Sequence, residues 1–418
     1  MNDFYHVFDT ADLDGSRATD YRTAFQQDRD RIVHTSAFRR LQAKTQVFLS
    51  GEYDFYRTRL THSIEVAQIG RAICYYLQKS SEALNDQFYI DPDLVEAICL
   101  THDLGDPPFG HAGERSLNHM LREHGGFEGN AQTLRIITKT IYLSAGKRRG
   151  MSPTRAFADG VLKYKVLHCD HPEQDHHFLY DDQQDVLDFV FDGASLPADI
   201  DANKFHSIEC QVMDWADDTA YSTNDLVDGI NAGFITIERA ERWAQTQSLS
   251  TIQQTAFEAV LQAIRDQRVE SHFGREIAAF IHAARLSERA NFMSDKTNRY
   301  RFQLEIDPDI NQRRKLYKQL AVDLVFRTPQ INQLEYKGDR MLQQIFQVLR
   351  NNYMNEAAPS SFRLLPPDLE PLVRATDATA AEKARLLADY VSGMTDSYTQ
   401  KTYQRLCESS FGSIGDIV

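Results

Sequence analysis

The pair His102-Asp103, in the segment ICLTHDLGDPPFGHAGE, brings together an imidazole nitrogen and a carboxylate oxygen, two common ligands of a divalent metal. A His-Asp dipeptide alone occurs by chance in most long chains. Two further candidate ligands flank it at a distance, His62 in RTRLTHSIEVAQIG and Asp217 in MDWADDTAYSTND. The pattern H…HD…D therefore predicts a metal site assembled from separate helices.

The predicted ligand set contains imidazoles and carboxylates but no thiolate, which suits Mn²⁺, Mg²⁺, Fe²⁺ or Zn²⁺. Since successive helical residues point about 100° apart, His102 and Asp103 can reach one ion only near the end of their helix. Gly105 and Pro107-Pro108 end that helix at the required place. Coordination positions left open for water or substrate are typical of a catalytic metal.

Other polar residues near these ligands are suited to handling protons and phosphate. His111 and Glu114 stand three residues apart and share a helix face, where the carboxylate raises the basicity of the imidazole. They are predicted as a proton-transfer pair in hydrolysis. The guanidinium groups of Arg57 and Arg59 and the ammonium group of Lys163 are candidates for binding phosphate oxygens.

A candidate substrate wall begins at one of the predicted metal ligands. Asp217, Tyr221 and Asp225 follow one another at intervals of four residues, so they share a broad helix face with about 80° of drift. Taken singly, each candidate in the chain has an ordinary alternative, such as a helix histidine, an exposed acidic turn or a surface arginine. Taken jointly, the candidates favour an active site.

Apolar residues recur at helical spacing over almost the whole chain, which predicts an all-α fold. Helices are expected over 60–77, 92–104, 110–124, 130–143, 208–230, 236–248, 251–286, 310–327, 329–353, 367–376 and 380–409. Short alternating stretches at 44–49 and 298–306 predict one minor strand pair. Ser and Pro cluster at 355–368, which indicates a boundary.

Residues 144–207 are expected to form an irregular insert that contains the histidine-rich run HCDHPEQDHH. The histidines of this run offer a second metal-site interpretation: His168, His171, His176 and His177. A solvated loop is the favoured interpretation, because the run lacks the neighbouring residues that usually orient metal ligands.

Composition restricts the class of protein. The chain has 418 residues, 42% of them hydrophobic and 25% charged, as in a globular protein with a substantial core. Its formal charge of −14 argues against nonspecific coating of nucleic acid, although a basic pocket for a phosphorylated molecule remains compatible with it. Five cysteines without CxxC spacing, no signal peptide and no long apolar stretch predict a cytoplasmic protein without a membrane span.

Several segments resemble the metal-dependent phosphohydrolase superfamily named after its His-Asp pair, the HD domain. They span residues 37–399: AFRRLQAKTQVF, RTRLTHSIEVAQIGRAI, LTHDLGDPPFGHAGE, GGFEGNAQTLRI, MDWADDTAYSTNDLVDG and DYVSGMTDSY. More narrowly, the chain is similar to the deoxyguanosine triphosphate triphosphohydrolases and to the mammalian SAM-and-HD-domain dNTPase. The resemblance implies an HD-domain helical bundle with additional C-terminal helices.

The resemblance also implies roles for single residues. It implies four metal ligands: His62, His102, Asp103 and Asp217. It implies that His111 and Glu114 form the catalytic pair near the α-phosphate. Because Asp106 stands where the mammalian relative has a histidine, proton transfer is expected to depend more on this pair. Implied substrate contacts are Arg59 on phosphate, Tyr221 and Asp225 on deoxyribose and phosphates, and Gln46 with Val47 at the 3′-hydroxyl, where they exclude a 2′-hydroxyl.

The implied reaction is hydrolysis of a dNTP to a deoxynucleoside and inorganic triphosphate with Mn²⁺ or Mg²⁺, Fe²⁺ and Zn²⁺ being alternatives. Residues 1–59 are expected to contribute to the nucleotide pocket, 60–230 to form the metal-dependent core and 231–418 to form a helical phosphohydrolase-associated region. A homo-oligomer with a dNTP or single-stranded DNA effector is expected. The alternatives are another HD phosphohydrolase, acting on nucleoside monophosphates, cyclic nucleotides or alarmones, and a non-catalytic nucleotide-responsive regulatory protein.

Overall fold

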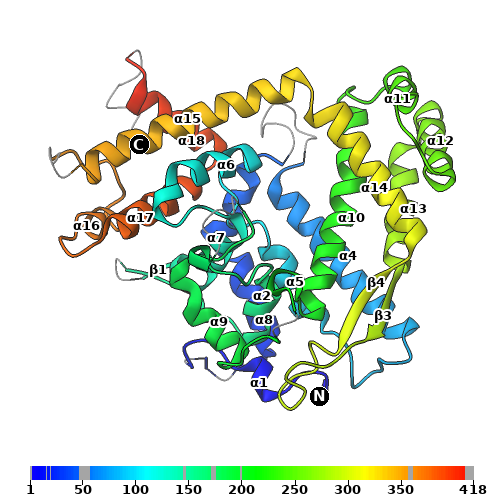
Figure 1. Ribbon diagram of the computed structural model, residues 1–418, viewed down its shortest axis with the longest axis horizontal. Helices are drawn as coiled ribbons and strands as arrows, with labels where there is room; N and C mark the ends of the chain where they lie inside the picture. The colour runs from blue at the N-terminus through cyan, green and yellow to red at the C-terminus, as the bar shows by residue number, and fades with distance from the viewer. Residues whose placement is uncertain are drawn as a thin grey trace.

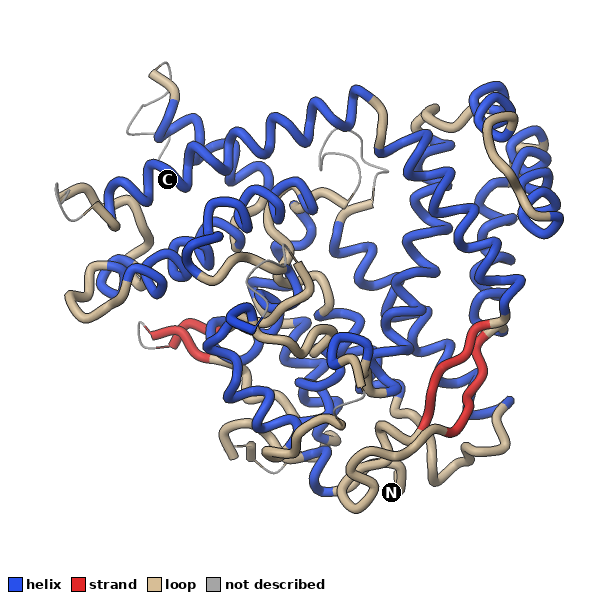
Figure 2. The backbone as a smooth tube through the Cα atoms, in the orientation of Figure 1, coloured by secondary structure: helices blue, strands red, loops and turns tan. Residues whose placement is uncertain are grey.

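The structure, a computed structural model, describes residues 2–15, 17–18, 20–46, 57–144, 147–170, 176–197, 200–355 and 361–409. Figure 2 shows helices throughout these ranges, with two short hairpins as the strands of the described chain. The predicted all-α fold is confirmed. No helix within the described ranges has the length and apolar character needed to span a bilayer.

Three helices form the centre of the molecule (Figure 1): α4 (Arg59–Ser80), α5 (Pro92–Thr101) and α10 (Ile208–Asn231). All three pack against one another. Each begins after a side chain that accepts a hydrogen bond from the first helical turn: Thr58, Asp91 and Ser207. These caps fix where the helices start, and therefore where residues of their first turns lie.

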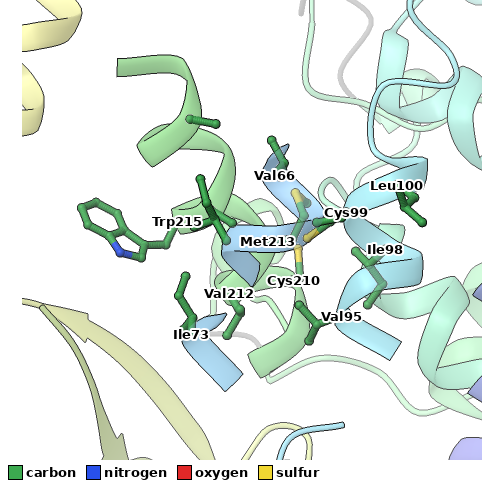
Figure 3. Close-up of a cluster of buried hydrophobic side chains, with 14 of the residues drawn as sticks. Val66, Ile73, Val95, Ile98, Cys99, Leu100, Cys210, Val212, Met213 and Trp215 are labelled. Atoms are coloured by element: carbon green, nitrogen blue, oxygen red, sulfur yellow. The ribbon is translucent and has the colours of Figure 1, made fainter. Parts of the chain in front are cut away.

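The main hydrophobic core fills the space between these helices. Figure 3 shows Val66 of α4, Ile98 of α5 and Met213 of α10 among the buried side chains. The helices approach closely because Gly70 of α4 has no side chain; a Cβ atom there would lie 2.9 Å from Cys99 Sγ. Close approach of α4 and α5 matters for the site, since each helix carries a predicted histidine ligand near one end.

The N-terminal segments cover one side of this core. They comprise α1 (Val7–Thr10), α2 (Ala24–Val33), α3 (Ser36–Arg40) and the 3₁₀-helix η1 (Leu41–Ala43). Helix α2 packs against α5, and η1 contacts α4. The chain after η1 forms an antiparallel bridge between Thr45 and Thr58, so residues just before Gln46 lie beside the start of α4.

Residues 144–207 are more regular than predicted. They contain β2 (Lys147–Arg149), which pairs with β1 (Tyr142–Ser144), helices α8 (Arg155–Val161) and α9 (Gln184–Phe191), and the 3₁₀-helices η4 (His168–Asp170), η5 (Asp181–Gln183) and η6 (Ala202–Lys204). Every residue of α8 is buried. Even its charged residues, Arg155 and Asp159, are buried, so the helix has no solvent-exposed face that a sequence pattern could reveal, and the prediction of an irregular insert was wrong here.

Two helices between α5 and this insert adjoin the site. Helix α6 (Gly110–Leu121) continues into the 3₁₀-helix η2 (Arg122–His124), and α7 (Gly129–Arg135) continues into the π-helix η3 (Ile136–Thr140). Both correspond to predicted helices, at 110–124 and 130–143.

The C-terminal region is also helical. It comprises α11 (Ile237–Ala244), α12 (Thr251–Arg265), α13 (Val269–His282), β3 (Ala284–Glu288), β4 (Phe302–Ile306), α14 (Pro308–Ala321), the π-helix η7 (Val322–Phe326), α15 (Pro329–Tyr353), α16 (Glu370–Val373), α17 (Ala380–Ser392) and α18 (Asp396–Cys407). Figure 1 shows α15 crossing the molecule above α6, with α17 and α18 beside it.

Helix α6 belongs to a second hydrophobic core that is shared with the C-terminal region. Leu117 of α6, Phe346 of α15 and Leu387 of α17 are fully buried or nearly so in this core. The contact between α6 and α15 is tight at Gly338, where a Cβ atom would lie 2.5 Å from the Phe109 ring. The helix that carries His111 and Glu114 is thus held by the C-terminal region, whereas the predicted metal ligands lie on helices of the main core.

Some predicted elements were wrong. The strand at 302–306 does occur, but its partner is β3, paired from Ala284 with Ile306 to Glu288 with Phe302, and not 44–49. Residues 47–49 lie outside the described ranges. The helix expected over 251–286 is broken at Gln267, whose φ of +54° is left-handed, and the one over 380–409 is broken after Ser392. Apolar periodicity continued across both breaks, because the flanking helices bury their faces in the same core.

Candidate metal centre and adjoining cavities

Three long helices bring the four predicted metal ligands together. His62 lies in the first turn of α4, His102 directly follows α5, and Asp217 lies in the middle of α10. His62 Nε2 is 3.0 Å from Asp217 Oδ1, and His102 Nε2 is 3.7 Å from the same oxygen. Ligand atoms of His62, His102 and Asp103 all lie within 4.8 Å of one another. We call His62, His102, Asp103 and Asp217 the HD cluster.

The orientation of His102 fits a metal ligand. Its Nδ1 lies 2.7 Å from the carbonyl oxygen of Cys99, which makes Nδ1 the protonated, donating nitrogen. Its Nε2 is buried and has no hydrogen-bond partner. A buried nitrogen that faces two carboxylates without a partner, and whose ring is fixed through the other nitrogen, is the arrangement expected of an imidazole that binds a cation.

Electrostatics keep the carboxylates of the HD cluster ionised. Burial raises the pKa of Asp217, but the hydrogen bond with His62 and the nearby imidazole of His102 outweigh it and hold this pKa well below its ordinary value. Burial likewise opposes ionisation of Asp103, yet His102 and Arg59 lower its pKa. Ionised carboxylates are what metal binding requires.

Arg59 connects the HD cluster to the next acidic residue. Its Nη1 lies 2.8 Å from Asp103 Oδ2, and the same atom pairs with Asp106. Burial raises the pKa of Asp106 to about 6, and the charge of Arg59 only partly opposes this shift. The predicted phosphate-binding arginine is therefore an ordered, buried charge at the edge of the cluster.

The predicted catalytic pair meets at the start of α6. His111 Nδ1 lies 3.5 Å from Glu114 Oε2, and the other oxygen of Glu114 accepts a hydrogen bond of 2.7 Å from the Gly129 amide. The hydrogen bond with Glu114 raises the pKa of His111. The His111 side chain is 75% exposed, so its ring can be reached by a molecule in the adjoining space.

Two cavities meet at the HD cluster. The first has a volume of about 330 Å³ and the second about 690 Å³. They share wall residues at the cluster and around it: Asp103, Asp106, His111, Arg115 and Asp217. A molecule that extended from one cavity into the other would pass the predicted metal ligands.

The first cavity contains two of the residues predicted to contact a deoxyribose. Gln46 lines it, and its side-chain Oε1 is buried without a hydrogen-bond partner. Tyr221 lines it as well, with its ring stacked on Phe326 at a centroid distance of 5.9 Å. Asp225 is buried and does not line either cavity, although its Oδ2 also has no partner. Val47 lies outside the described residues.

The other predicted phosphate ligands are already paired. Arg57 lies 2.9 Å from Glu65 and also pairs with Asp228, so the structure ties it to α4 and α10. Lys163 lines the second cavity, and its Nζ lies 2.8 Å from Asp214 Oδ1. Of these two cations, only Lys163 faces the space beside the HD cluster.

A second group of potential ligand atoms was not predicted. His206, Cys210 and Asp214 place their ligand atoms within 4.8 Å of one another at the start of α10, and we call them the His206 cluster. Its Asp214 is neutralised by Lys163, and His206 Nε2 donates to the carbonyl oxygens of Lys163 and Asn203. His206, Cys210 and Asp214 follow one another at intervals of four residues, a spacing that places side chains on one helix face and could have indicated a metal site. We assign no metal here, because a bound ion would compete with the Lys163 ammonium for Asp214.

The histidine-rich run does not form a metal site in the described part of the chain. His176 and His177 line the second cavity, with the two rings 4.2 Å apart, whereas His168 packs against Phe178. His171 lies outside the described residues.

The C-terminal region supplies an apolar wall that sequence patterns did not reveal. Val322 and Phe326 of η7, with Ile331 and Leu334 of α15, line the first cavity. In the sequence these residues fit the apolar period of a core helix, so nothing distinguished them from packing residues. A π-helix widens the turn and is often found at functional sites.

Comparison with known proteins agrees with this arrangement. The HD domain family matches residues 59–162, and the phosphohydrolase-associated domain family matches 304–405. A deoxyguanosinetriphosphate triphosphohydrolase-like protein of Shewanella sp. (strain ANA-3) is 35% identical over 96% of this chain and 95% of its own length. The chain belongs to this family of HD-domain phosphohydrolases.

Further relatives extend the comparison beyond one genus. A deoxyguanosinetriphosphate triphosphohydrolase-like protein 2 of Deinococcus radiodurans is 36% identical over 95% of both chains. The counterpart in Shewanella loihica is 34% identical over 96% of both chains. The match to the HD domain family includes His62, His102 and Asp103, while Asp217 lies beyond its end.

Proposed function

We propose that this protein hydrolyses dNTPs to a deoxynucleoside and inorganic triphosphate in a metal-dependent reaction. The observation that carries the proposal is the position of the HD cluster at the junction of two cavities with different walls. One wall presents aromatic and apolar side chains and an unpartnered amide oxygen, which suit a nucleoside. The second cavity is lined by cations that suit a polyphosphate, Arg115, Arg122 and Lys163, and also by carboxylates, among them Glu114 and Glu128.

The nucleoside would occupy the first cavity. A buried amide oxygen without a partner, such as Gln46 Oε1, is satisfied when a ligand hydroxyl donates to it, and the 3′-hydroxyl of a deoxyribose is such a donor. The stacked rings of Tyr221 and Phe326 offer a face for the sugar or base. We propose Tyr221 and Gln46 with Val47 as the residues that select the sugar; Asp225, which lines neither cavity, would contribute indirectly.

The phosphates would extend from the HD cluster into the second cavity. Arg59 lines the first cavity beside the HD cluster, Arg115 lines both cavities, and Lys163 lines the second. Because Lys163 is paired with Asp214, binding of a triphosphate would share this ammonium between two anions. These cations would offset the charge of the triphosphate, which the net acidic chain otherwise repels.

The HD cluster fits a divalent cation, since it combines ionised carboxylates with the unpartnered Nε2 of His102. We propose His62, His102, Asp103 and Asp217 as its ligands and Mn²⁺ or Mg²⁺ as the metal, Fe²⁺ and Zn²⁺ being compatible with the same donors. A metal bound there supplies a Lewis acid for a phosphoryl oxygen.

The chain supplies the proton transfer. Hydrolysis joins a water oxygen to the α-phosphorus, breaks the bond between this phosphorus and O5′, and delivers a proton to O5′. His111 borders both cavities, and Glu114 orients its ring and favours its protonated form. We propose that this pair moves the proton, with Arg59 holding the α-phosphate in place.

Product analysis tests the proposal. The metal-free protein is incubated with each of the four dNTPs and Mn²⁺ or Mg²⁺, with and without a second dNTP or single-stranded DNA, and the anionic products are separated by ion exchange. Release of intact triphosphate is expected. Release of pyrophosphate or monophosphate, or hydrolysis of monophosphates, cyclic nucleotides or alarmones in place of dNTPs, would instead support another HD phosphohydrolase. Nucleotide binding without turnover would support a regulatory protein.

The division of labour along the chain is part of the proposal. Residues 60–230 would form the metal-dependent core, 1–59 would contribute to the nucleotide pocket through Gln46, and 231–418 would close the nucleoside cavity through Phe326. Activation by a dNTP or single-stranded DNA and assembly into a homo-oligomer stay predictions, for which the effector arms above and a molar-mass measurement are the tests.

A further inference from the structure

Asp396 lies at the first position of α18, in the segment GMTDSY, and contacts two distant parts of the chain at once. Its side chain is 6% exposed. One carboxylate oxygen accepts a hydrogen bond of 3.0 Å from the amide of Phe109. The other accepts from Thr45 twice, through the amide at 2.7 Å and through the hydroxyl.

Both partners of Asp396 directly adjoin residues of the proposed site. Thr45 precedes Gln46, whose side chain lines the nucleoside cavity. Phe109 precedes α6, whose first turns carry His111 and Glu114, and its left-handed φ of +63° sets the direction in which that helix leaves the loop. A single carboxylate therefore fixes the sugar-facing segment relative to the proton-transfer pair.

A second contact ties the same parts together. Lys44 is buried, and its Nζ donates to the carbonyl oxygens of Asp106, at 2.5 Å, and Ser392, at 3.0 Å. The amide of Arg59 in turn donates to the Lys44 carbonyl oxygen at 3.3 Å. Lys44 and Thr45, which are adjacent in the chain, thus connect the C-terminal region with the loop after α5 and with the start of α4.

We infer that Asp396 is a positioning residue that sets the sugar-selecting side of the cavity relative to the catalytic pair. The inference rests on the proposed function and adds to it a residue outside the metal site and outside both cavity walls. Asp396 contributes no group to the reaction. It acts by satisfying three donors that have no other acceptor in the described structure and by keeping two backbone segments in register.

Loss of this carboxylate has a defined expected effect. Small displacements of reacting groups reduce turnover by up to about 100-fold. We therefore expect Asp396→Ala to lower kcat/KM for a dNTP by about 10- to 100-fold. Because Gln46 moves with Thr45, the preference for a dNTP over the matching ribonucleotide should fall as well. Asp396→Asn keeps one acceptor oxygen and should give intermediate values.

Glu370→Gln is the matched control. Glu370 is another buried carboxylate of the C-terminal region; it accepts from the Leu365 amide at 3.3 Å and from the Tyr353 hydroxyl. The hydrogen bonds and ion pairs of its side chain within the described ranges are to Tyr353, Leu365 and Arg374, which lie outside the site. If Asp396 acted only by stabilising the C-terminal region, Glu370→Gln would change kcat/KM and sugar preference to the same extent.

The experiment compares the wild-type protein with Asp396→Asn, Asp396→Ala and Glu370→Gln in the metal-loaded full chain. Sugar preference and the separate values of kcat and KM are measured alongside amide hydrogen exchange at Thr45 and Phe109. Faster exchange at both amides with reduced sugar preference, in the Asp396 variants and not in Glu370→Gln, is the expected result. Unchanged sugar preference in both Asp396 variants, or equal losses in Glu370→Gln, would overturn the inference.

Hydrogen exchange separates failure of this inference from failure of the proposed function. If the wild-type protein releases no triphosphate from any dNTP, the proposed function fails while the exchange result still tests the positioning contacts. If the wild-type protein is active and exchange at Thr45 and Phe109 is unchanged in Asp396→Asn and Asp396→Ala, the inference fails and the proposed function stands.

Discussion

The HD cluster and the His206 cluster adjoin each other on α10, where Asp217 and Asp214 are three residues, or just under one turn, apart. In each cluster, imidazole and carboxylate atoms lie within 4.8 Å of one another: those of His62, His102 and Asp103 in the first, and those of His206 and Asp214 in the second. Their surroundings differ. In the HD cluster, His102 Nε2 is buried without a partner, and the cluster borders two cavities. In the His206 cluster, the imidazole donates to backbone carbonyl oxygens and the carboxylate is paired with Lys163.

The difference shows that proximity of ligand atoms is not enough to indicate a metal centre. What distinguishes the HD cluster is charge that its own neighbours do not neutralise completely, together with open space on both sides. In the His206 cluster, Lys163 neutralises the carboxylate and backbone carbonyl oxygens hold the imidazole, and groups paired in this way stabilise a fold rather than bind a ligand. The following predictions test that distinction, beginning with the largest expected effect.

Replacing the carboxylate of one cluster at a time gives the largest contrast. Asp217→Asn should remove metal binding and lower triphosphate release by about 10³-fold or more, since a metal contributes several kcal/mol to such reactions. Asp214→Asn, one turn away, should keep the metal and most of the turnover. Metal content by mass spectrometry and turnover of dGTP check both variants. Equal loss of metal in both variants would mean that the two clusters form one site.

The proton-transfer pair should be separable from metal binding. Glu114→Gln removes the charge that raises the pKa of His111, so turnover should fall by about 10²- to 10⁴-fold while metal content stays unchanged. His206→Gln replaces an imidazole of the other cluster and is the control, with turnover close to that of the wild-type protein. A Glu114→Gln variant with full turnover would exclude this carboxylate from the reaction.

The His206 cluster should contribute to stability instead. Asp214→Ala leaves the Lys163 ammonium without its carboxylate, and the free energy of unfolding should fall by about 1 kcal/mol, because the pair is partly exposed. Urea unfolding of the metal-free protein measures the change. Mn²⁺ should not restore the loss. If Mn²⁺ stabilised the wild-type protein and failed to stabilise Asp214→Ala, the His206 cluster would be the metal site.

The smallest expected effect concerns pH. Burial lowers the pKa of His206, and nearby Lys165 and Lys163 act in the same direction, while Asp214 opposes them. The unfolded chain then takes up a proton at higher pH than the folded protein, so stability is lost as pH falls below about 6.5. His206→Gln should therefore show a smaller drop in Tm between pH 8 and pH 5.5 than the wild-type protein. Equal drops would show that His206 does not contribute.

Sequence patterns predicted the long helices and the residues of the HD cluster, for a physical reason. Helices α4, α5 and α10 are amphipathic or capped by recognisable residues, and a metal site needs imidazoles and carboxylates, which stand together in the recognisable pair His102-Asp103. The proposed ligands His62 and Asp217 lie on such helices, so their convergence could be anticipated. Helix α8 gave no such signal, because it is buried on all sides.

The parts of the site that depend on distant contacts could not be predicted. Phe326 and Ile331 read as core residues, and only the fold of η7 and α15 places them on the wall of the first cavity. Asp396 lies in a segment that resembled the family, but the sequence does not show that its carboxylate reaches Thr45 and Phe109. The pairing of Arg57 with Asp228 was equally hidden.

The most direct test of the central claim is a titration of the metal-free protein with Mn²⁺, in which bound metal and triphosphate release from dGTP are measured in the same samples. We predict that triphosphate release is absent without metal, rises in proportion to occupancy of a single site, and is abolished together with that site in Asp103→Ala. Undiminished release from the metal-free protein, or from Asp103→Ala, would contradict the account.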